Sequence, residues 1–104
     1  MMSKLDLGRL KFSWDDRKSE LTYRRRGFDF MAAASAFLDP HQLPAFNSEK
    51  GGEERWQVLA GVRGLGLLCV VYTTVEHEDY EEIRIISARK ATGEEANWYR
   101  DPWR

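Results

Sequence analysis

The alternation of hydrophobic and polar positions in residues 81–92 predicts a strand with apolar groups on both faces. Successive side chains of a strand point to opposite sides. One face then carries Ile83, Ile85, Ser87 and Arg89, and the other carries Arg84, Ile86 and Ala88. Because both faces hold isoleucine, we expect an inner strand that is covered on each side. The arginines of the two faces either pack their stems along the sheet or serve as functional cations.

Two further strands are predicted immediately before this one. Residues 53–62 alternate, with Glu54 and Trp56 on one face and Arg55 on the other. Residues 65–75 are almost continuously apolar, which is typical of a central strand. Since the connections between the three strands are short, we expect an antiparallel meander.

The N-terminal part of the chain predicts a strand and a helix. Residues 10–14, LKFSW, alternate as a short strand. Asp15 or Asp16 then provides a helix N-cap, and Gly27 suits the left-handed position that follows a helix. The predicted helix therefore runs to about Arg26, and its last turn is basic, which complements the helix dipole.

A second helix is expected after Asp29, another N-cap residue, and Pro40 ends it. Its apolar stripe has helical spacing and is assigned to the core; it consists of Phe30, Ala33, Ala34, Phe37 and Leu38. Residues 41–52 are rich in Pro, Gly, Asn and Ser, so we expect a long connection with at most a short edge strand at 43–46.

The C-terminal segment opens with a capping box, in which the Thr92 hydroxyl is followed three residues later by Glu95. It predicts a short helix to about Arg100, closed by Pro102. The expected fold class is α+β: an antiparallel sheet, made of the three-stranded meander plus the N-terminal strand, packed with two N-terminal helices and a short C-terminal helix.

Composition limits what such a chain can do. Its 104 residues suit a single domain, taken as residues 1–104. The only cysteine, Cys69, excludes an internal disulfide and a thiolate zinc cage. No run is long enough to span a membrane and the N-terminus has no signal-peptide core, so we expect a cytoplasmic protein. The net charge of −1 conceals an asymmetry, because residues 76–82 contain five acids and no Lys or Arg.

From about Lys11 to Tyr99 the chain resembles the BrnT family of toxins, the ribonuclease halves of bacterial type II toxin–antitoxin pairs. GEERW and IRIISARKAT are the most specific of the segments that carry the resemblance, which are, in chain order, FSWDDRK, RRGFDF, AFLDP, GEERW, VVYTT and IRIISARKAT followed by EE and Tyr99. The resemblance implies a RelE-like fold and an endoribonuclease that cleaves RNA without a metal and arrests growth. It also implies a BrnA-like antitoxin as partner, with DNA contacted only through that antitoxin.

Cleavage by internal attack of a ribose 2′-hydroxyl needs a base, a cation for the developing charge and a proton source. We expect Arg55 and Arg89 to stabilise the charge. Glu54 is the nearest candidate base, but strand alternation places it opposite Arg55 unless a bulge intervenes. Tyr72 is an alternative proton handler. The two histidines, His41 and His77, are expected to be solvated in loops.

Arg25, Arg26 and Arg84 are the expected phosphate-binding residues. Position 26 departs from the family pattern, in which the first helix commonly ends with Lys-His-Gly rather than Arg25-Arg26-Gly27. A guanidinium cannot move a proton near neutral pH as an imidazole can. A base could stack on Trp56 or Tyr72, although Trp56 is more readily explained by core packing.

Two other function classes compete with this interpretation. The chain could be a weakened or inactive relative that acts mainly as an antitoxin-binding co-repressor module, in which the arginines meet acidic groups of the partner. A metal-dependent nuclease is disfavoured because no His or carboxylate cluster has ligand spacing. We therefore expect no metal and no cofactor.

Overall fold

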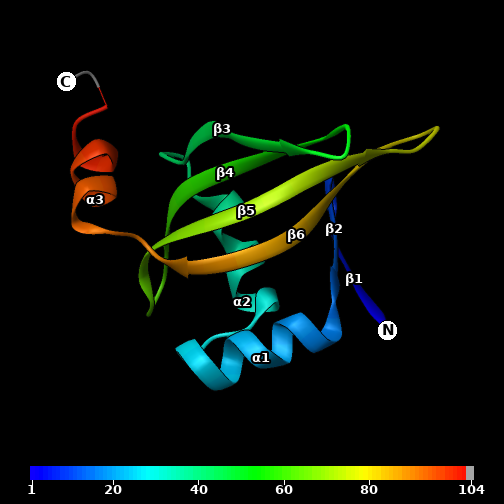
Figure 1. The fold of residues 1–104 in the computed structure, drawn as a ribbon, viewed down its shortest axis with the longest axis horizontal. Helices are drawn as coiled ribbons and strands as arrows, with labels where there is room; N and C mark the ends of the chain where they lie inside the picture. Colours follow the sequence, from blue (N-terminus) through cyan, green and yellow to red (C-terminus); the bar gives the residue numbers. More distant parts are fainter. Residues whose placement is uncertain (103–104) are drawn as a thin grey trace.

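The computed structural model describes residues 1–102. Six strands form one mixed sheet in the order β1-β2-β6-β5-β4-β3, and helices lie around it (Figure 1). The strands are β1 (Met2–Leu7), β2 (Leu10–Asp15), β3 (Leu43–Lys50), β4 (Glu53–Val62), β5 (Gly66–Glu76) and β6 (Glu81–Lys90). The helices are α1 (Asp16–Arg26), α2 (Phe30–Ala34), the 3₁₀ helix η1 (Ser35–Leu38) and α3 (Gly93–Arg100). The α+β class is confirmed.

The predicted meander is present, because β4 pairs with β5 and β5 with β6, all antiparallel. The sheet is nevertheless mixed rather than antiparallel, since β2 runs parallel to β6 over Lys11–Trp14. No local signal in residues 10–14 fixes the direction of this pairing. It is decided by the path through α1 and α2, which returns the chain to the far side of the sheet.

Both edge strands differ from the sequence prediction. β1 was not predicted; it forms a hairpin with β2 through a turn that contains Gly8 at φ 78°. β3 extends to Lys50 rather than ending at residue 46, with a register shift at Asn47. Asn and Ser are weak strand formers, but pairing along β4 outweighs that preference. Gly51 and Gly52, both at positive φ, close this hairpin.

α1 has the predicted ends. The Asp15 side chain accepts hydrogen bonds from the backbone N–H groups of Arg17 (2.8 Å) and Lys18 (3.3 Å). Gly27 follows the helix at φ 85°. The pairing of β2 with β6 ends at Ile85, and α1 lies alongside the remaining part of β6 (Figure 1).

The second predicted helix is divided into α2 and η1. Phe30, Ala33, Ala34 and Phe37 are buried as expected, whereas Leu38 is 60% exposed, so its assignment to the core is wrong. A 3₁₀ helix has three residues per turn instead of 3.6. The change after Ala34 therefore rotates the last residue of the stripe away from the sheet.

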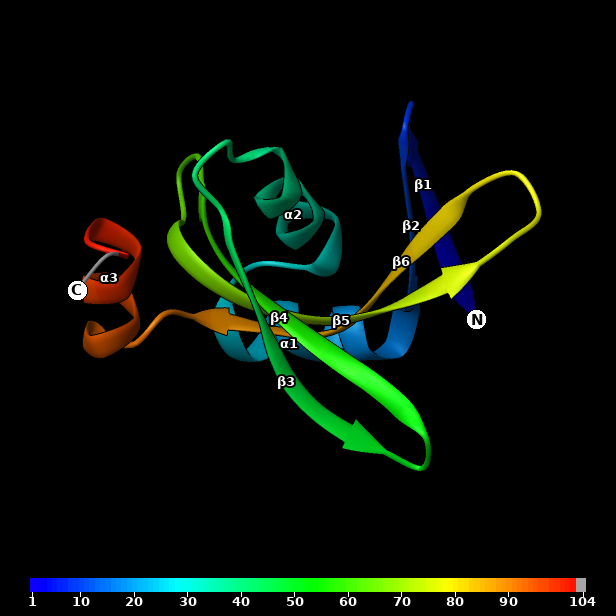
Figure 2. The same ribbon diagram turned by 90° about the horizontal axis from the view of Figure 1, so that it is seen from above.

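The main core lies between α2–η1 and one face of the sheet. Figure 2 shows α2 to one side of β4 and β5, with α3 beyond the end of the strands. The largest fully buried side chains include Phe12, Phe30, Leu68 and Ile85. No helix within residues 1–102 is long and apolar enough to cross a membrane.

Candidate active site

A β-bulge in β6 changes which side chains share a face. Val71 pairs with Ser87 and Tyr72 with Ile85, so Ile86 is the extra residue. Arg84 is opposite Thr73 and Arg89 is opposite Cys69, and both partners lie on the same face of β5. The prediction that the two arginines lie on opposite faces is therefore wrong. An unbroken alternation cannot anticipate a bulge.

We call this face, which lies opposite the core formed with α2 and η1, the open face. A row of polar residues crosses it from one side of the sheet to the other. Ser48 pairs with Arg55, Thr73 with Arg84 and Arg84 with Ser13. The register of β4 and β5, with Trp56 opposite Tyr72, places Arg55 next to Thr73. Two strand spacings separate Arg55 from Arg84, about 10 Å between their Cα atoms.

Each arginine of this row has a glutamate two residues before it on its own strand. Arg55 Nε lies 3.7 Å from Glu53 Oε1, and Arg84 Nη2 lies 3.5 Å from Glu82 Oε2. Arg55 Nε is buried and has no hydrogen-bond partner within residues 1–102. A buried N–H without a partner is rare and costly. This N–H is therefore a polar group of the open face that Glu53, at 3.7 Å, satisfies only through its charge.

Glu82 is the most buried charged residue of the open face, at 4% exposure. Its carboxylate accepts hydrogen bonds from Ser13 Oγ and from His77 Nε2, the latter at 2.9 Å. Burial alone would raise the pKa of Glu82, but the hydrogen bonds from Ser13 and His77 and the charge of Arg84 together lower it below its usual range. Glu82 is thus held as a carboxylate beside Arg84.

His77 is the functional candidate that the sequence did not identify. It is exposed, as expected, but its ring also hydrogen-bonds Glu82 and stacks on Tyr80 with centroids 4.4 Å apart. A backbone hydrogen bond from His77 N–H to Tyr80 C=O closes the hairpin. The spacing of His77 and Glu82 across a tight turn was the available signal, but the acidic composition of residues 76–82 favoured a solvated loop.

Arg89 is on the open face but outside the polar row. Its guanidinium donates to both carboxylate oxygens of Glu95, at 2.7 and 3.0 Å. Glu95 also accepts from the Thr92 backbone N–H, which completes the predicted capping box of α3. Four residues of β5 separate the position opposite Arg89 from Thr73, or about 13 Å. The structure therefore does not bring Arg89 together with Arg55.

Glu54 and Tyr72 also lie apart from the polar row. β4 is regular around Arg55, so Glu54 points to the opposite face, as alternation predicts. Tyr72 faces the core, where its ring meets that of Phe37 edge-on at 5.0 Å, and burial raises the pKa of its hydroxyl. Trp56 shares the face of Tyr72 and packs against Phe46 at 5.4 Å.

Arg25 and Arg26 are exposed in the last turn of α1. Neither forms an ion pair with another residue among those described. α1 lies beside β6 rather than on the open face (Figure 1). Both guanidinium groups are therefore open to solvent.

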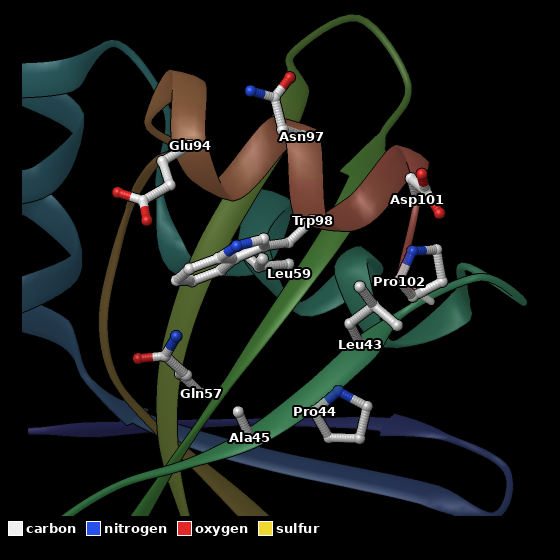
Figure 3. Close-up of a pocket in the computed structure, with 10 residues that line it drawn as sticks. All are labelled: Leu43, Pro44, Ala45, Gln57, Leu59, Glu94, Asn97, Trp98, Asp101 and Pro102. Atoms are coloured by element: carbon white, nitrogen blue, oxygen red, sulfur yellow. The ribbon is translucent and has the colours of Figure 1, made fainter. Parts of the chain in front are cut away.

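A groove of about 540 Å³ lies between α3 and strands β3 and β4. Leu43, Ala45, Gln57 and Leu59 form its floor, and Trp98 of α3 points into it (Figure 3). Trp98 is 49% exposed. Gln57 lies two residues beyond Arg55 on the same face of β4, so this end of the groove is next to the polar row.

The remaining candidates for chemistry are inert in their surroundings. Cys69 is 1% exposed, and burial raises the pKa of its thiol, which disfavours the reactive thiolate. Residues 1–102 contain no group of three or more His, Cys, Asp or Glu side chains arranged to hold a metal ion.

Comparison with protein families places most of the chain in a known family. Residues 14–95 match the family described as the ribonuclease toxin, BrnT, of type II toxin–antitoxin systems. The match runs from the end of β2 to the first turn of α3, and it includes every residue of the polar row except Ser13. No curated protein is significantly similar to the chain.

Proposed function

The chain belongs to the BrnT family of type II toxin–antitoxin ribonuclease toxins, and on this premise we propose that it cleaves RNA without a metal ion at Arg55 and Arg84. The placement of these two arginines on either side of Thr73 carries the proposal. Their side chains are long enough to reach a phosphate bound over Thr73 from both sides.

Guanidinium groups suit the charge that develops in this reaction. Attack of the 2′-oxygen on phosphorus places extra negative charge on the phosphate oxygens, and fixed cationic donors stabilise it. Arginine presents paired N–H donors that match a phosphate. Arg55 and Arg84 are kept in place by Glu53 and Glu82, and both side chains stay partly exposed, at 30% and 44%, so that their terminal N–H groups can face the substrate.

The catalytic roles expected for Arg89, Glu54 and Tyr72 receive no support from the geometry. Arg89 is bound by Glu95 at the far end of the open face. Glu54 and Tyr72 belong to the opposite face. We therefore assign Arg89 to the ordering of α3 and seek the proton-transfer group on the open face.

We propose the groove beside α3 as the binding site for a base of the RNA. Aromatic side chains bind single-stranded RNA by stacking on its bases, and Trp98 is an exposed aromatic residue that points into the groove. Gln57 accepts from Asn47 through Oε1, so its amino group can donate to a base edge. Arg25 and Arg26 would add phosphate contacts at the rim.

A type II toxin acts with an antitoxin protein. We propose that a BrnA-like, DNA-binding antitoxin covers the open face and prevents RNA from reaching the arginines. In the complex of toxin and antitoxin, only the antitoxin would contact DNA. The proposed site of action is the cytoplasm, with growth arrest as the outcome. Arg26 in place of the family's histidine favours a second candidate, an inactive relative that acts as a co-repressor with its antitoxin.

Purified, antitoxin-free protein incubated with RNA in excess EDTA would test the proposal. We expect cleavage by the wild type, at least a hundredfold loss in Arg55→Ala and in Arg84→Ala, and no loss in the matched control Arg24→Ala. Arg24 is an exposed arginine that pairs with Glu20 on the same helix. If the folded wild type leaves the RNA intact, the result favours the co-repressor function. If the wild type cleaves RNA only when EDTA is absent, the result contradicts the metal-free mechanism.

Induced expression in bacteria extends the same comparison to cells. We expect growth arrest and RNA loss with the wild type and with Arg24→Ala, and normal growth with Arg55→Ala. Arrest that persists in a folded, cleavage-deficient Arg55→Ala would separate toxicity from RNA cleavage.

A further inference from the structure

The end of the β5–β6 hairpin holds a histidine whose orientation is fixed by a buried carboxylate. Glu82 Oε1 lies 2.9 Å from His77 Nε2, and Glu82 Oε2 receives Ser13 Oγ and faces Arg84 Nη2 at 3.5 Å. The Glu82 side chain is 5% exposed, whereas the His77 side chain is 35% exposed. The carboxylate is therefore built into the sheet, and the imidazole remains accessible.

The hydrogen bond to Glu82 determines which ring nitrogen of His77 carries the proton. A carboxylate accepts only, so Nε2 must be the donor in neutral imidazole. Nδ1 then has a free lone pair and makes no hydrogen bond with another residue among those described. A carboxylate that orients a histidine in this manner also stabilises the imidazolium formed when the ring takes up a proton.

His77 lies beside Arg84, one of the two arginines of the proposed phosphate site, because both side chains contact Glu82. Thr73 is in the polar row, and His77 follows it by four residues, so the alternation of β5 continues onto the open face at Val75 and His77. The contact with Glu82, which pairs with Val75, agrees with this side. His77 and Arg84 bind the same carboxylate, one at each oxygen. A phosphate held by Arg84 thus has the imidazole beside it.

We propose that His77, positioned by Glu82, is the general base that accepts the proton of the ribose 2′-hydroxyl. This inference rests on the proposed ribonuclease function and supplies the group which that function lacks. The 2′-oxygen forms a bond to phosphorus while its proton passes to His77 Nδ1. The bond from phosphorus to the 5′-oxygen breaks, and the 5′-oxygen takes a proton from water. The products are a 2′,3′-cyclic phosphate and a 5′-hydroxyl.

Charged and titratable groups face His77 from several elements. Glu82 contacts it from β6, and Arg84 faces the same carboxylate. Tyr80 stacks on it, and Lys11 of β2 lies 5.4 Å from the Tyr80 ring centroid. The hairpin itself adds the acids Glu76, Glu78 and Asp79. The base form of His77 is the neutral ring, so the cleavage rate is expected to rise with pH as the ring loses its proton.

A pH–rate profile of purified protein on a short RNA, in EDTA from pH 5 to 9, would test the assignment. We expect a rising limb in the wild type, and in His77→Gln a hundredfold or larger loss of kcat without that limb. KM should stay within about threefold. Glu82→Gln should also lower kcat, because the amide no longer fixes the orientation of the ring as the carboxylate does. The matched control is His41→Gln, since His41 is the other histidine and is exposed in the segment after η1.

Imidazole rescue separates a chemical role from a structural one. Added imidazole should restore cleavage in His77→Ala and leave Arg55→Ala inactive. If the wild type cleaves RNA and His77→Gln gives the same pH–rate profile, this inference is wrong and the proposed function stands. The absence of rescue in folded His77→Ala would also count against it. A folded wild type that leaves RNA intact would overturn the proposed function together with the inference.

Discussion

Arg89 donates two hydrogen bonds to the carboxylate of Glu95, 2.7 and 3.0 Å long, and this pair joins the end of β6 to the first turn of α3. Glu95 is 7% exposed and is also the acidic member of the capping box. One carboxylate therefore closes the N-terminus of α3 and fixes its position on the sheet. The groove that contains Trp98 depends on this contact, because α3 forms one of its walls.

Removal of Arg89 is expected to reduce stability. Arg89→Ala leaves Glu95 charged, mostly buried and without its cation, which costs less than the roughly 3–5 kcal/mol of a fully buried pair, because Arg89 is 40% exposed and solvent screens the pair. Arg24→Ala breaks the exposed pair with Glu20 and should cost about 0.5 kcal/mol or less. Urea unfolding of both variants measures the difference. Equal, small losses would contradict the structural role of Arg89.

The same pair predicts a pH dependence of stability. The hydrogen bond from Arg89 lowers the pKa of Glu95 from 4.5 to about 2, against the opposing effect of burial. Because the folded-state pKa lies below the unfolded value, the stabilisation is complete above about pH 4.5 and is lost as the pH falls towards 2. It amounts to at most about 3 kcal/mol, and less because Arg89 is 40% exposed and solvent screens the pair.

Urea unfolding at several pH values, with Glu95→Gln as reference, measures this effect. The gap in stability between wild type and variant should narrow from pH 5 to pH 2. A constant gap would mean that Glu95 does not titrate differently in the folded and unfolded chains.

Arg55 is expected to act through the geometry of its guanidinium and not through charge alone. Arg55→Lys keeps the charge but loses the paired donors, so we predict a tenfold or larger fall in kcat with little change in stability. Single-turnover cleavage and urea unfolding together provide the measurement. A lysine variant as active as the wild type would show that a point charge suffices.

Trp98 is expected to contribute to RNA binding rather than to the chemical step. Loss of one stacked base costs about 1–3 kcal/mol, so Trp98→Ala should weaken binding of a short RNA by roughly 5- to 150-fold. Fluorescence anisotropy with a 2′-deoxy analogue, which lacks the attacking hydroxyl, isolates binding. Leu38→Ala, at another exposed apolar residue, is the matched control. If Trp98→Ala binds the RNA as tightly as the wild type, no base of the RNA stacks on Trp98 in the groove.

Arg25 and Arg26 should show their phosphate contacts in the salt dependence of RNA binding. Each phosphate that the protein no longer neutralises reduces the slope of log K against log salt concentration by about 0.7 for single strands. The double substitution of both residues by Ala is expected to flatten that slope by about 1.4 and to leave folding intact, because both residues are exposed. The same slope in variant and wild type would show that α1 does not meet the RNA.

The elements that depend on short-range signals were determined by the sequence. The Asp15 cap and Gly27 bound α1, and the Thr92–Glu95 capping box begins α3, because each acts within one helical turn. The meander followed from hydrophobic runs joined by short connections. The family was recognised from segments such as GEERW and IRIISARKAT, which the match over residues 14–95 confirms.

The candidate site was decided by the tertiary structure. A bulge at Ile86 brings Arg84 and Arg89 to one face, and it depends on pairing with β5, which strand periodicity does not contain. The parallel contact of β2 with β6 brings Ser13 to Arg84 across 71 residues of chain. Glu82 becomes a buried carboxylate, and His77 its partner, only once those strands are paired. Burial and long-range pairing set the surroundings of these groups, and local sequence specifies neither.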